Sequence, residues 1–344
     1  VWAFLISLIF IFVGIFLPDK LIALLGGDSS IIAVGRDYTR IFMIFSPFFM
    51  WNHICMAFVR NDGNPSVAMA ATLFGSLFNI VFDYILMFPL GLGMQGAALA
   101  TGCSPIVGIL ICCIHFKSSK CTITLKPVRL SVKRLLHSCH VGISSFVAEL
   151  SSGVITIVFN MIILNIAGNT GVAAYGVIAN TSLVAVSLFN GISQGSQPLI
   201  SDSYGKGDLK NVMYLIKLAA ATSLFISVLL ITAVYLGAPS ITTVFNSEKN
   251  PLLAQYAISG LRIYFTGFLF AGINIVGSSI LSSVESAKFA FIVSIMRGFA
   301  AITFFAFLLS KIFGLTGIWS AFPAAEFLTI FVTVYGLFKI HRPA

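Results

Sequence analysis

Three carboxylic acids lie inside long apolar stretches of the sequence, and Asp83 is the best placed of them for ion chemistry. Asp83 follows Asn79 by four residues in the run GSLFNIVFDYILMF, so both side chains share one face of a helix. At about 1.5 Å per residue, Thr101 in the next apolar stretch lies at a similar depth. An acid, an amide and a hydroxyl at one level predict a proton or sodium site. The alternative is a protonated Asp83 that only holds helices together.

Glu149 and Glu326 are the other two acids within apolar stretches. Glu149 lies near the middle of its stretch, with Ser151 and Asn160 as candidate polar neighbours. A desolvated carboxylate that gains protons readily suits proton exchange, whereas hydrogen bonding to serine is the structural alternative. Glu326 is the weakest candidate, because we expect no polar neighbour for it beyond Thr329.

The composition places these acids in a membrane protein. Of the 344 residues, 58% are apolar and 9% charged, with a mean hydropathy of +1.02, which excludes an ordinary soluble domain. We expect an all-α membrane protein, a polytopic helical bundle of about ten spans, because runs of about 20 apolar residues cross the hydrocarbon core as helices. The expected spans are 1–25, 36–59, 66–90, 94–116, 139–166, 172–200, 211–236, 255–281, 288–310 and 314–338.

The net charge of +9 indicates topology and not nucleic-acid binding. When the loops between spans are numbered alternately, thirteen of the twenty Lys and Arg fall on one side, which includes the loop 117–134. The positive-inside rule makes that side cytoplasmic, and the C-terminus with it. We therefore expect a multi-pass protein whose surroundings are the lipid bilayer, with no nucleic-acid partner.

A weak internal repeat relates the first third of the chain to the last third, about 221 residues later. Residues 22–41 align with residues 242–263, and LGMQGAALA at 92–100 aligns with FGLTGIWSA at 313–321. Such a repeat is typical of a transporter built from two similar bundles. Because the offset is an even number of spans, we expect two pseudo-symmetric lobes in the same orientation.

The repeat also predicts the domain organisation. Two spans precede the second copy and none precedes the first, so we expect an N-terminal lobe that lacks its first two spans. The predicted divisions are residues 1–116, an incomplete N-lobe with spans three to six; 117–138, a basic cytoplasmic linker; and 139–344, a C-lobe with spans seven to twelve.

Cysteine and histidine residues near the linker give no recognisable metal pattern. The set Cys121, His137, Cys139 and His140 has a spacing that matches no common zinc motif, so a solvated loop is the favoured interpretation. The chain also lacks a G-x-x-x-x-G-K-[ST] loop, which disfavours a nucleotide-driven pump. We expect no enzyme activity, no metal and no cofactor.

Several motifs resemble those of the multidrug and toxic compound extrusion (MATE) family, over essentially the whole chain. They are NGISQGSQPLISDSYGKGD at 190–208, RNDGNP at 60–65, the pair Asn79 and Asp83, and GMQGAALATG at 93–102. The resemblance implies a twelve-span protein of two six-helix lobes in a prokaryotic plasma or inner membrane. It further implies export of small-molecule drugs or organic cations in exchange for H⁺ or Na⁺ by alternating access, and we expect a monomer.

The same resemblance assigns cation-binding and coupling residues. By their spacing from Asp83, the N-lobe positions of the family fall on Tyr38, His53, Asn79 and Thr101. His53 stands where the family has Asn, although Asn52 is adjacent, and the Asp that the family has in its first span is missing from this chain.

In the C-lobe the resemblance assigns Glu149, which sodium-coupled members pair with an Asp in the tenth span. Residues 255–281 contain no acid, so the partner is missing here. Gln197 and Pro198 match the eighth-span motif of the family, and together with Asn160 they are the candidates for a substrate cleft or gate.

Two other classes of function remain open from the sequence. A lipid-linked oligosaccharide flippase resembles this family in fold, but it should carry a basic cleft for pyrophosphate, whereas Lys and Arg are here nearly confined to loops. A channel or non-transporting membrane receptor is the second alternative. The two-lobe repeat and the carboxylates at unequal depths favour an antiporter.

Overall fold

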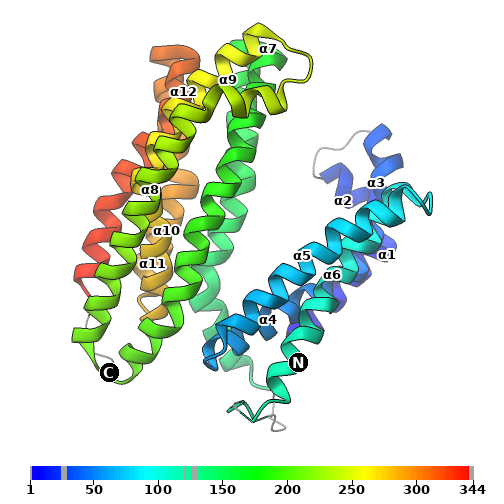
Figure 1. Cartoon of the computed structure of the whole chain (residues 1–344), viewed down its shortest axis with the longest axis vertical. Helices are drawn as coiled ribbons and strands as arrows, with labels where there is room; N and C mark the ends of the chain where they lie inside the picture. Colours follow the sequence, from blue (N-terminus) through cyan, green and yellow to red (C-terminus); the bar gives the residue numbers. More distant parts are fainter. Residues whose placement is uncertain (1, 25–28, 120, 125–129, 341–344) are drawn as a thin grey trace. The chain divides into compact units, whose positions relative to one another are not determined.

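The computed structural model describes residues 2–24, 29–119, 121–124 and 130–340, and these contain helices and no strand. Figure 1 shows the helices in chain order from blue to red. The elements are α1 (Trp2–Phe16), α2 (Pro18–Leu24), α3 (Ser29–Ile44), α4 (Ser46–Asn61), α5 (Pro65–Met87), α6 (Gly93–Phe116), α7 (Val132–Gly205), α8 (Leu209–Phe245), α9 (Pro251–Tyr264), the 3₁₀ turn η1 (Phe265–Gly267), α10 (Phe268–Ser283), α11 (Ala287–Ile295), the π-helical turn η2 (Met296–Ala300) and α12 (Ala301–Phe338).

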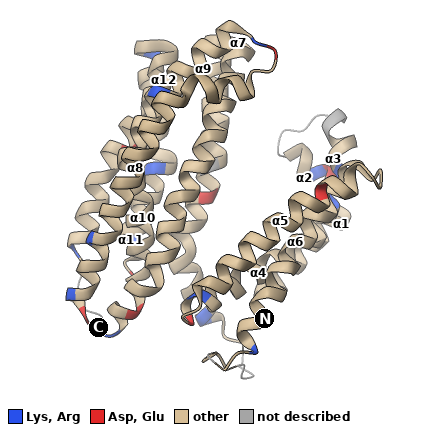
Figure 2. Cartoon of the chain, viewed as in Figure 1, with Lys and Arg blue, Asp and Glu red and all other residues tan. Residues whose placement is uncertain are grey.

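The chain divides into two compact units, Val1–Leu135 and Leu136–Ala344. The division falls within the predicted linker, of which Lys120, Lys126, Pro127 and Arg129 lie outside the described residues. In each unit, Lys, Arg, Asp and Glu lie mostly near helix ends, and the middle of most helices is uncharged (Figure 2).

Helices long enough to cross a membrane occur in both units. Among the described residues, six stretches are long and apolar enough, and two bent pairs, α1–α2 and α3–α4, raise the number to eight. Two of the six, α7 with 74 residues and Ala287–Phe338 with 52, exceed by far what one crossing of a core roughly 30 Å thick requires. Gly168 (φ 61°) breaks α7 and Gly314 (φ 58°) breaks α12, so each stretch can supply two crossings. The helices therefore account for the predicted number of spans.

In the first unit, a row of small residues on α6 lets α4 come close. A Cβ atom on Gly102 would lie 2.6 Å from the Phe45 ring, and one on Gly108 would lie 2.3 Å from Oδ1 of Asn52. Small residues at such contacts are the usual means of close helix packing in membranes. The same helix carries Thr101, which is thereby held against α5 and α4.

The segment RNDGNP forms the tight turn between α4 and α5. Gly63 has φ 79°, a backbone conformation that glycine adopts without strain. The Asn64 side chain then accepts a hydrogen bond from the backbone N–H of Val67 at 3.4 Å, and Pro65 occupies the first turn of α5. Asn250 and Pro251 start α9 in the same way in the second unit.

The core of the second unit is rich in aromatic residues. Trp319 and Phe159 are fully buried, and the rings of Tyr264 and Phe322 stack with their centroids 4.3 Å apart. These contacts join α7, α9 and α12. They hold α9, η1 and α10 in one continuous but bent stretch beside the end of the chain.

Candidate functional site

In the first unit, α5 and α6 bring Asn79 and Thr101 into contact. Nδ2 of Asn79 donates a hydrogen bond to Oγ1 of Thr101 at 3.3 Å. Asp83, one turn further along α5, is half-buried, and its Oδ1 atom is buried without a hydrogen-bond partner among the described residues. Buried polar oxygens are rarely left unsatisfied, and such an atom is a candidate for a water or an ion.

The two family positions on α3 and α4 are placed differently from each other. Tyr38 is half-buried, and its ring stacks on Phe42 with centroids 6.2 Å apart. His53 is exposed and forms no hydrogen bond within the described part of the chain, whereas the neighbouring Asn52 packs against Gly108 of α6. The Oδ1 atom of Asn52 is buried and, like that of Asp83, has no partner in the part of the chain that is described.

A second polar group joins the α4–α5 turn to the end of α6 and the start of the linker. Nε2 of His115 lies 2.7 Å from Oδ2 of Asp62, and Nδ1 of His115 lies 3.1 Å from Nδ2 of Asn64. The hydroxyl of Thr122 donates to Oδ1 of Asp62, and its backbone N–H donates to Oδ2 at 3.0 Å. Hydrogen bonds from Thr122 and His115 lower the pKa of Asp62 to about 2.

Cys121 lies beside this group, which gives the position an unexpected metal-ligand composition. The ligand atoms of Asp62, His115 and Cys121 all lie within 4.8 Å of one another, whereas the described residues place no His137, Cys139 or His140 in such a group. Asp62 and His115 already satisfy each other and their neighbours, so the arrangement is fully explained as a fastening between the turn and the linker.

In the second unit, Glu149 lies exposed on α7 and has no hydrogen bond or ion pair within the described ranges. The predicted neighbour Ser151 is buried and donates to the backbone oxygen of Val147, one turn earlier in its own helix. Asn160 is half-buried, Gln197 is exposed, and Pro198 lies inside α7. The structure shows no contact that joins these three candidates.

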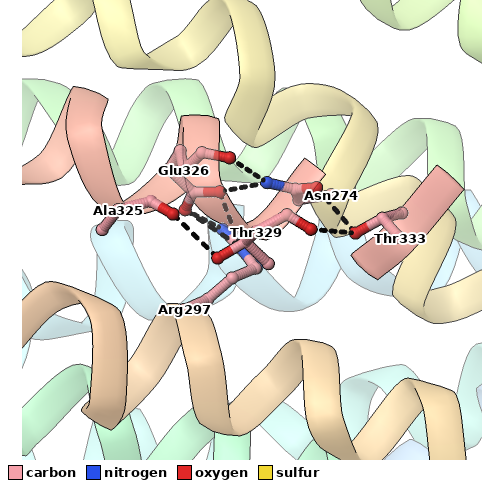
Figure 3. Close-up of polar contacts among 6 residues, drawn as sticks. All are labelled: Asn274, Arg297, Ala325, Glu326, Thr329 and Thr333. Carbon is pink, nitrogen blue, oxygen red and sulfur yellow. Dashed lines mark hydrogen bonds and ion pairs between the residues drawn. The ribbon is translucent and has the colours of Figure 1, made fainter. Parts of the chain in front are cut away.

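Glu326 is surrounded by polar partners, and the expectation that it has none beyond Thr329 is wrong. Arg297 holds its carboxylate from two nitrogens: Nε lies 2.9 and 3.0 Å from the two oxygens, and Nη2 lies 2.8 Å from Oε1. Asn274 donates from Nδ2 to Oε2 at 2.7 Å, and Thr333 donates to Oδ1 of Asn274 at 2.7 Å. Figure 3 shows these side chains converging, while Thr329 donates to the backbone of Ala325.

Three elements of the second unit supply this network: α10 carries Asn274, η2 carries Arg297 and α12 carries Glu326. The side chain of Glu326 is 3% exposed and that of Arg297 is 20% exposed. The sequence analysis noted an acid on the last span without asking what lay at its depth on the neighbouring spans. Counting depth on both sides of Gly314, as was done for Asp83 and Thr101, would have indicated Arg297.

Comparison with known families defines the class. The model of the MatE family matches residues 1–85 and 145–305, which is more than half of the chain. The chain therefore belongs to the MatE family of membrane transporters.

Individual relatives have printed functions. The multidrug export protein MepA of Staphylococcus saprophyticus subsp. saprophyticus is 28% identical over 320 residues, which cover 92% of this chain and 69% of that protein. MepA of Staphylococcus aureus strain NCTC 8325 / PS 47 is 27% identical over the same shares of both chains.

Solved structures agree on the fold. The outward-facing conformation of a multidrug resistance MATE family transporter superposes with a TM-score of 0.89 at 21% identity, over 99% of this chain and 78% of that one. A MATE structure in complex with MaL6 gives 0.91 at 20% identity, over 98% and 77%. This confirms the predicted all-α membrane fold with two lobes.

Proposed function

We propose that this protein is a secondary active antiporter that exports small-molecule drugs or organic cations in exchange for H⁺ or Na⁺. Membership of the MatE family and the similarity to relatives named as multidrug export proteins support the class of cargo. The geometry around Asp83 supports ion coupling.

The observation that carries the proposal is the buried, unpartnered Oδ1 atom of Asp83 beside the pair Asn79 and Thr101. A carboxylate in an apolar helix is costly when it is charged and alone. Binding a proton or a sodium ion removes that cost, and the amide and hydroxyl oxygens nearby are suitable further ligands for a hard cation. Asp83 is thus the group whose state changes, and Asn79 and Thr101 position it.

Exchange follows if the cation and the drug favour different arrangements of the protein. A ligand shifts a conformational equilibrium only by its difference in affinity for the two states. A charged Asp83 and a neutralised Asp83 differ in their desolvation cost, so an environment that changes between inward-open and outward-open states converts the ion gradient into a bias. Alternating access of the two lobes around one cargo site is the corresponding mechanism in repeat-built transporters.

Glu149 is the second candidate coupling or cargo-binding group. Its exposed carboxylate lacks a permanent counter-ion within the described chain, so it is available to an organic cation. Gln197, Pro198 and Asn160 lie on the same helix α7 and are proposed to shape the cleft or its gate. A cleft for drug-sized cargo requires mainly apolar walls with few polar anchors, which this helix provides.

The test is Asp83→Asn in the full-length protein reconstituted into liposomes. The amide keeps the shape and much of the hydrogen bonding but removes the titratable charge, so ion-driven export of a cationic dye should fall at least about tenfold. Asp19→Asn is the matched control, because Asp19 is exposed and pairs only with the exposed Arg36 in a surface salt bridge. Export by Asp83→Asn at the wild-type rate, with the same dependence on pH and sodium, would show that Asp83 is structural.

A further inference from the structure

The carboxylate of Glu326 is fully occupied by groups of its own unit. Its Oε1 atom receives two nitrogens of Arg297, and its Oε2 atom receives Nε of Arg297 and the amide of Asn274. Thr333 fixes the orientation of that amide by donating to its oxygen. Figure 3 shows the guanidinium lying directly against the carboxylate, in the place where a free cation would bind an isolated acid.

We propose that Arg297 is a tethered cation that permanently occupies the cation position of Glu326 and excludes Na⁺ and H⁺ from it. Arg297 is thereby a specificity-determining residue: it makes the acid of the last span a fixed ion pair and confines ion exchange to other carboxylates. This inference rests on the proposed antiport only in naming Asp83 and Glu149 as those carboxylates.

The chemistry of the pair supports permanence. A guanidinium stays protonated at any physiological pH, and its planar fork matches a carboxylate through two parallel hydrogen bonds. The 3% exposure of Glu326 places the pair in a medium where opposite charges attract more strongly than in water. A sodium ion would have to displace a charge that is covalently attached to the neighbouring span and already desolvated.

The other groups around the pair add no competing charge. Tyr264 of α9 is buried and close enough to Glu326 and Arg297 to interact with both electrostatically. Asn274 comes from α10, and Thr329 and Thr333 come from α12 itself; all three are buried and neutral. With the guanidinium removed, Glu326 and these oxygens would form a set of the kind that hard cations prefer.

The local backbone is adapted to this placement. Arg297 lies in the π-helical turn η2, a rare conformation that is frequent at functional sites. The next residue, Gly298, packs so closely on α7 that a Cβ atom would lie 2.0 Å from Oγ of Ser151. The turn is therefore wedged against α7 two residues from Glu149, which fixes the position of the guanidinium.

The experiment compares ion-dependent stability in the purified full-length protein, a readout that does not require transport. The variants are Arg297→Met, Glu326→Gln and the double variant, each melted in sodium or choline chloride and in mildly acidic or mildly alkaline buffer. Arg297→Met should lower the melting temperature by about 5–10 °C in choline at alkaline pH, because it leaves a buried charge unpaired. Added Na⁺ or acid should restore a large part of that loss, since a ligand that binds the folded state stabilises it.

The double variant Arg297→Met/Glu326→Gln should lose this acquired ion dependence, which assigns it to Glu326. Glu326→Gln alone should keep whatever ion dependence the wild type has; this arm decides the matter even if Arg297→Met does not fold. Loss of the wild-type ion response in Glu326→Gln, or an ion response in Arg297→Met no larger than that of the wild type, would overturn the proposal. Failure of the antiport shows instead in the Asp83→Asn transport assay and leaves these melting data unaffected.

Discussion

Gly93 and Gly314 lie 221 residues apart in the aligned repeat, and both have a positive φ, 51° and 58°. Three residues later, Gly96 and Gly317 repeat a second feature. A Cβ atom on Gly96 would lie 2.7 Å from the backbone carbon of Leu86, and one on Gly317 would lie 1.9 Å from the backbone oxygen of Leu309. The two units therefore enter equivalent helices through the same kind of turn and the same close backbone contact.

This contact predicts that Gly317→Ala is strongly destabilising. The new methyl group would collide with backbone at Leu309, which cannot move aside like the end of a side chain, and we expect a loss of about 1–3 kcal/mol in the free energy of unfolding. Thermal unfolding of the full-length protein in detergent measures it. Gly176→Ala is the control, because a Cβ atom there meets nothing within 4 Å; equal stability of the two variants would contradict the contact.

The hydrogen-bonded Asp62 predicts an acid-sensitive turn. Its pKa is lowered from 3.8 to about 2 in the folded protein, so its stabilisation is complete above the unfolded value and is lost as the pH falls through the folded one. Hydrogen exchange at the amide of Thr122, which donates to Asp62, should therefore accelerate below pH 3.8. Asp62→Asn should show fast exchange already at neutral pH, with Asp202→Asn as a surface control. Protection that stays constant in Asp62→Asn would disprove the coupling.

The exposed Glu149 predicts a phenotype distinct from that of Asp83. Glu149→Gln should reduce the export of cationic cargo by about tenfold at low cargo concentration, because one charge-assisted contact in a partly desolvated site is worth about 1.5 kcal/mol or more. Neutral cargo should be exported nearly as before. Glu248→Gln, at an exposed acid in the loop before α9, is the matched control. An equal loss for neutral cargo would move Glu149 from cargo binding to ion coupling.

The uneven distribution of Lys and Arg predicts the orientation in the membrane. A cysteine placed at Thr122 should be shielded from an impermeant thiol reagent in intact cells, whereas one placed at Glu248 should react. Both are introduced into a full-length protein whose six native cysteines are replaced. The reverse labelling pattern would place the C-terminus outside the cell.

The helices were largely predictable because apolar run length alone determines them. The bends were not: α3 and α4 meet at 48° within one expected span, and η1 separates α9 from α10 within another. These bends follow from packing between neighbouring helices, such as the ring of Phe45 against Gly102, which no run of sequence reveals.

The contact of Asn79 with Thr101 could be predicted because α5 and α6 are consecutive and antiparallel, so equal depth implies proximity. Choosing between Asn52 and His53 was beyond such counting, since one residue along a helix rotates a side chain by about 100°. Depth alone does not show that rotation, whereas the close contact with Gly108 does. The partners of Glu326 were missed because Asn274 is 52 residues away in the chain and comes from another span.

The ion pair between η2 and α12 also has a consequence for how the protein is made. Each charge alone opposes insertion of its helix by roughly 2.5–3.5 kcal/mol on translocon scales, and Arg297 leaves the ribosome 29 residues before Glu326. During synthesis, the arginine must wait at the translocon or at the membrane interface until the last helix brings its counter-charge. The final two spans are thus a single unit of membrane integration, and the C-terminal helix determines whether the one before it stays in the bilayer.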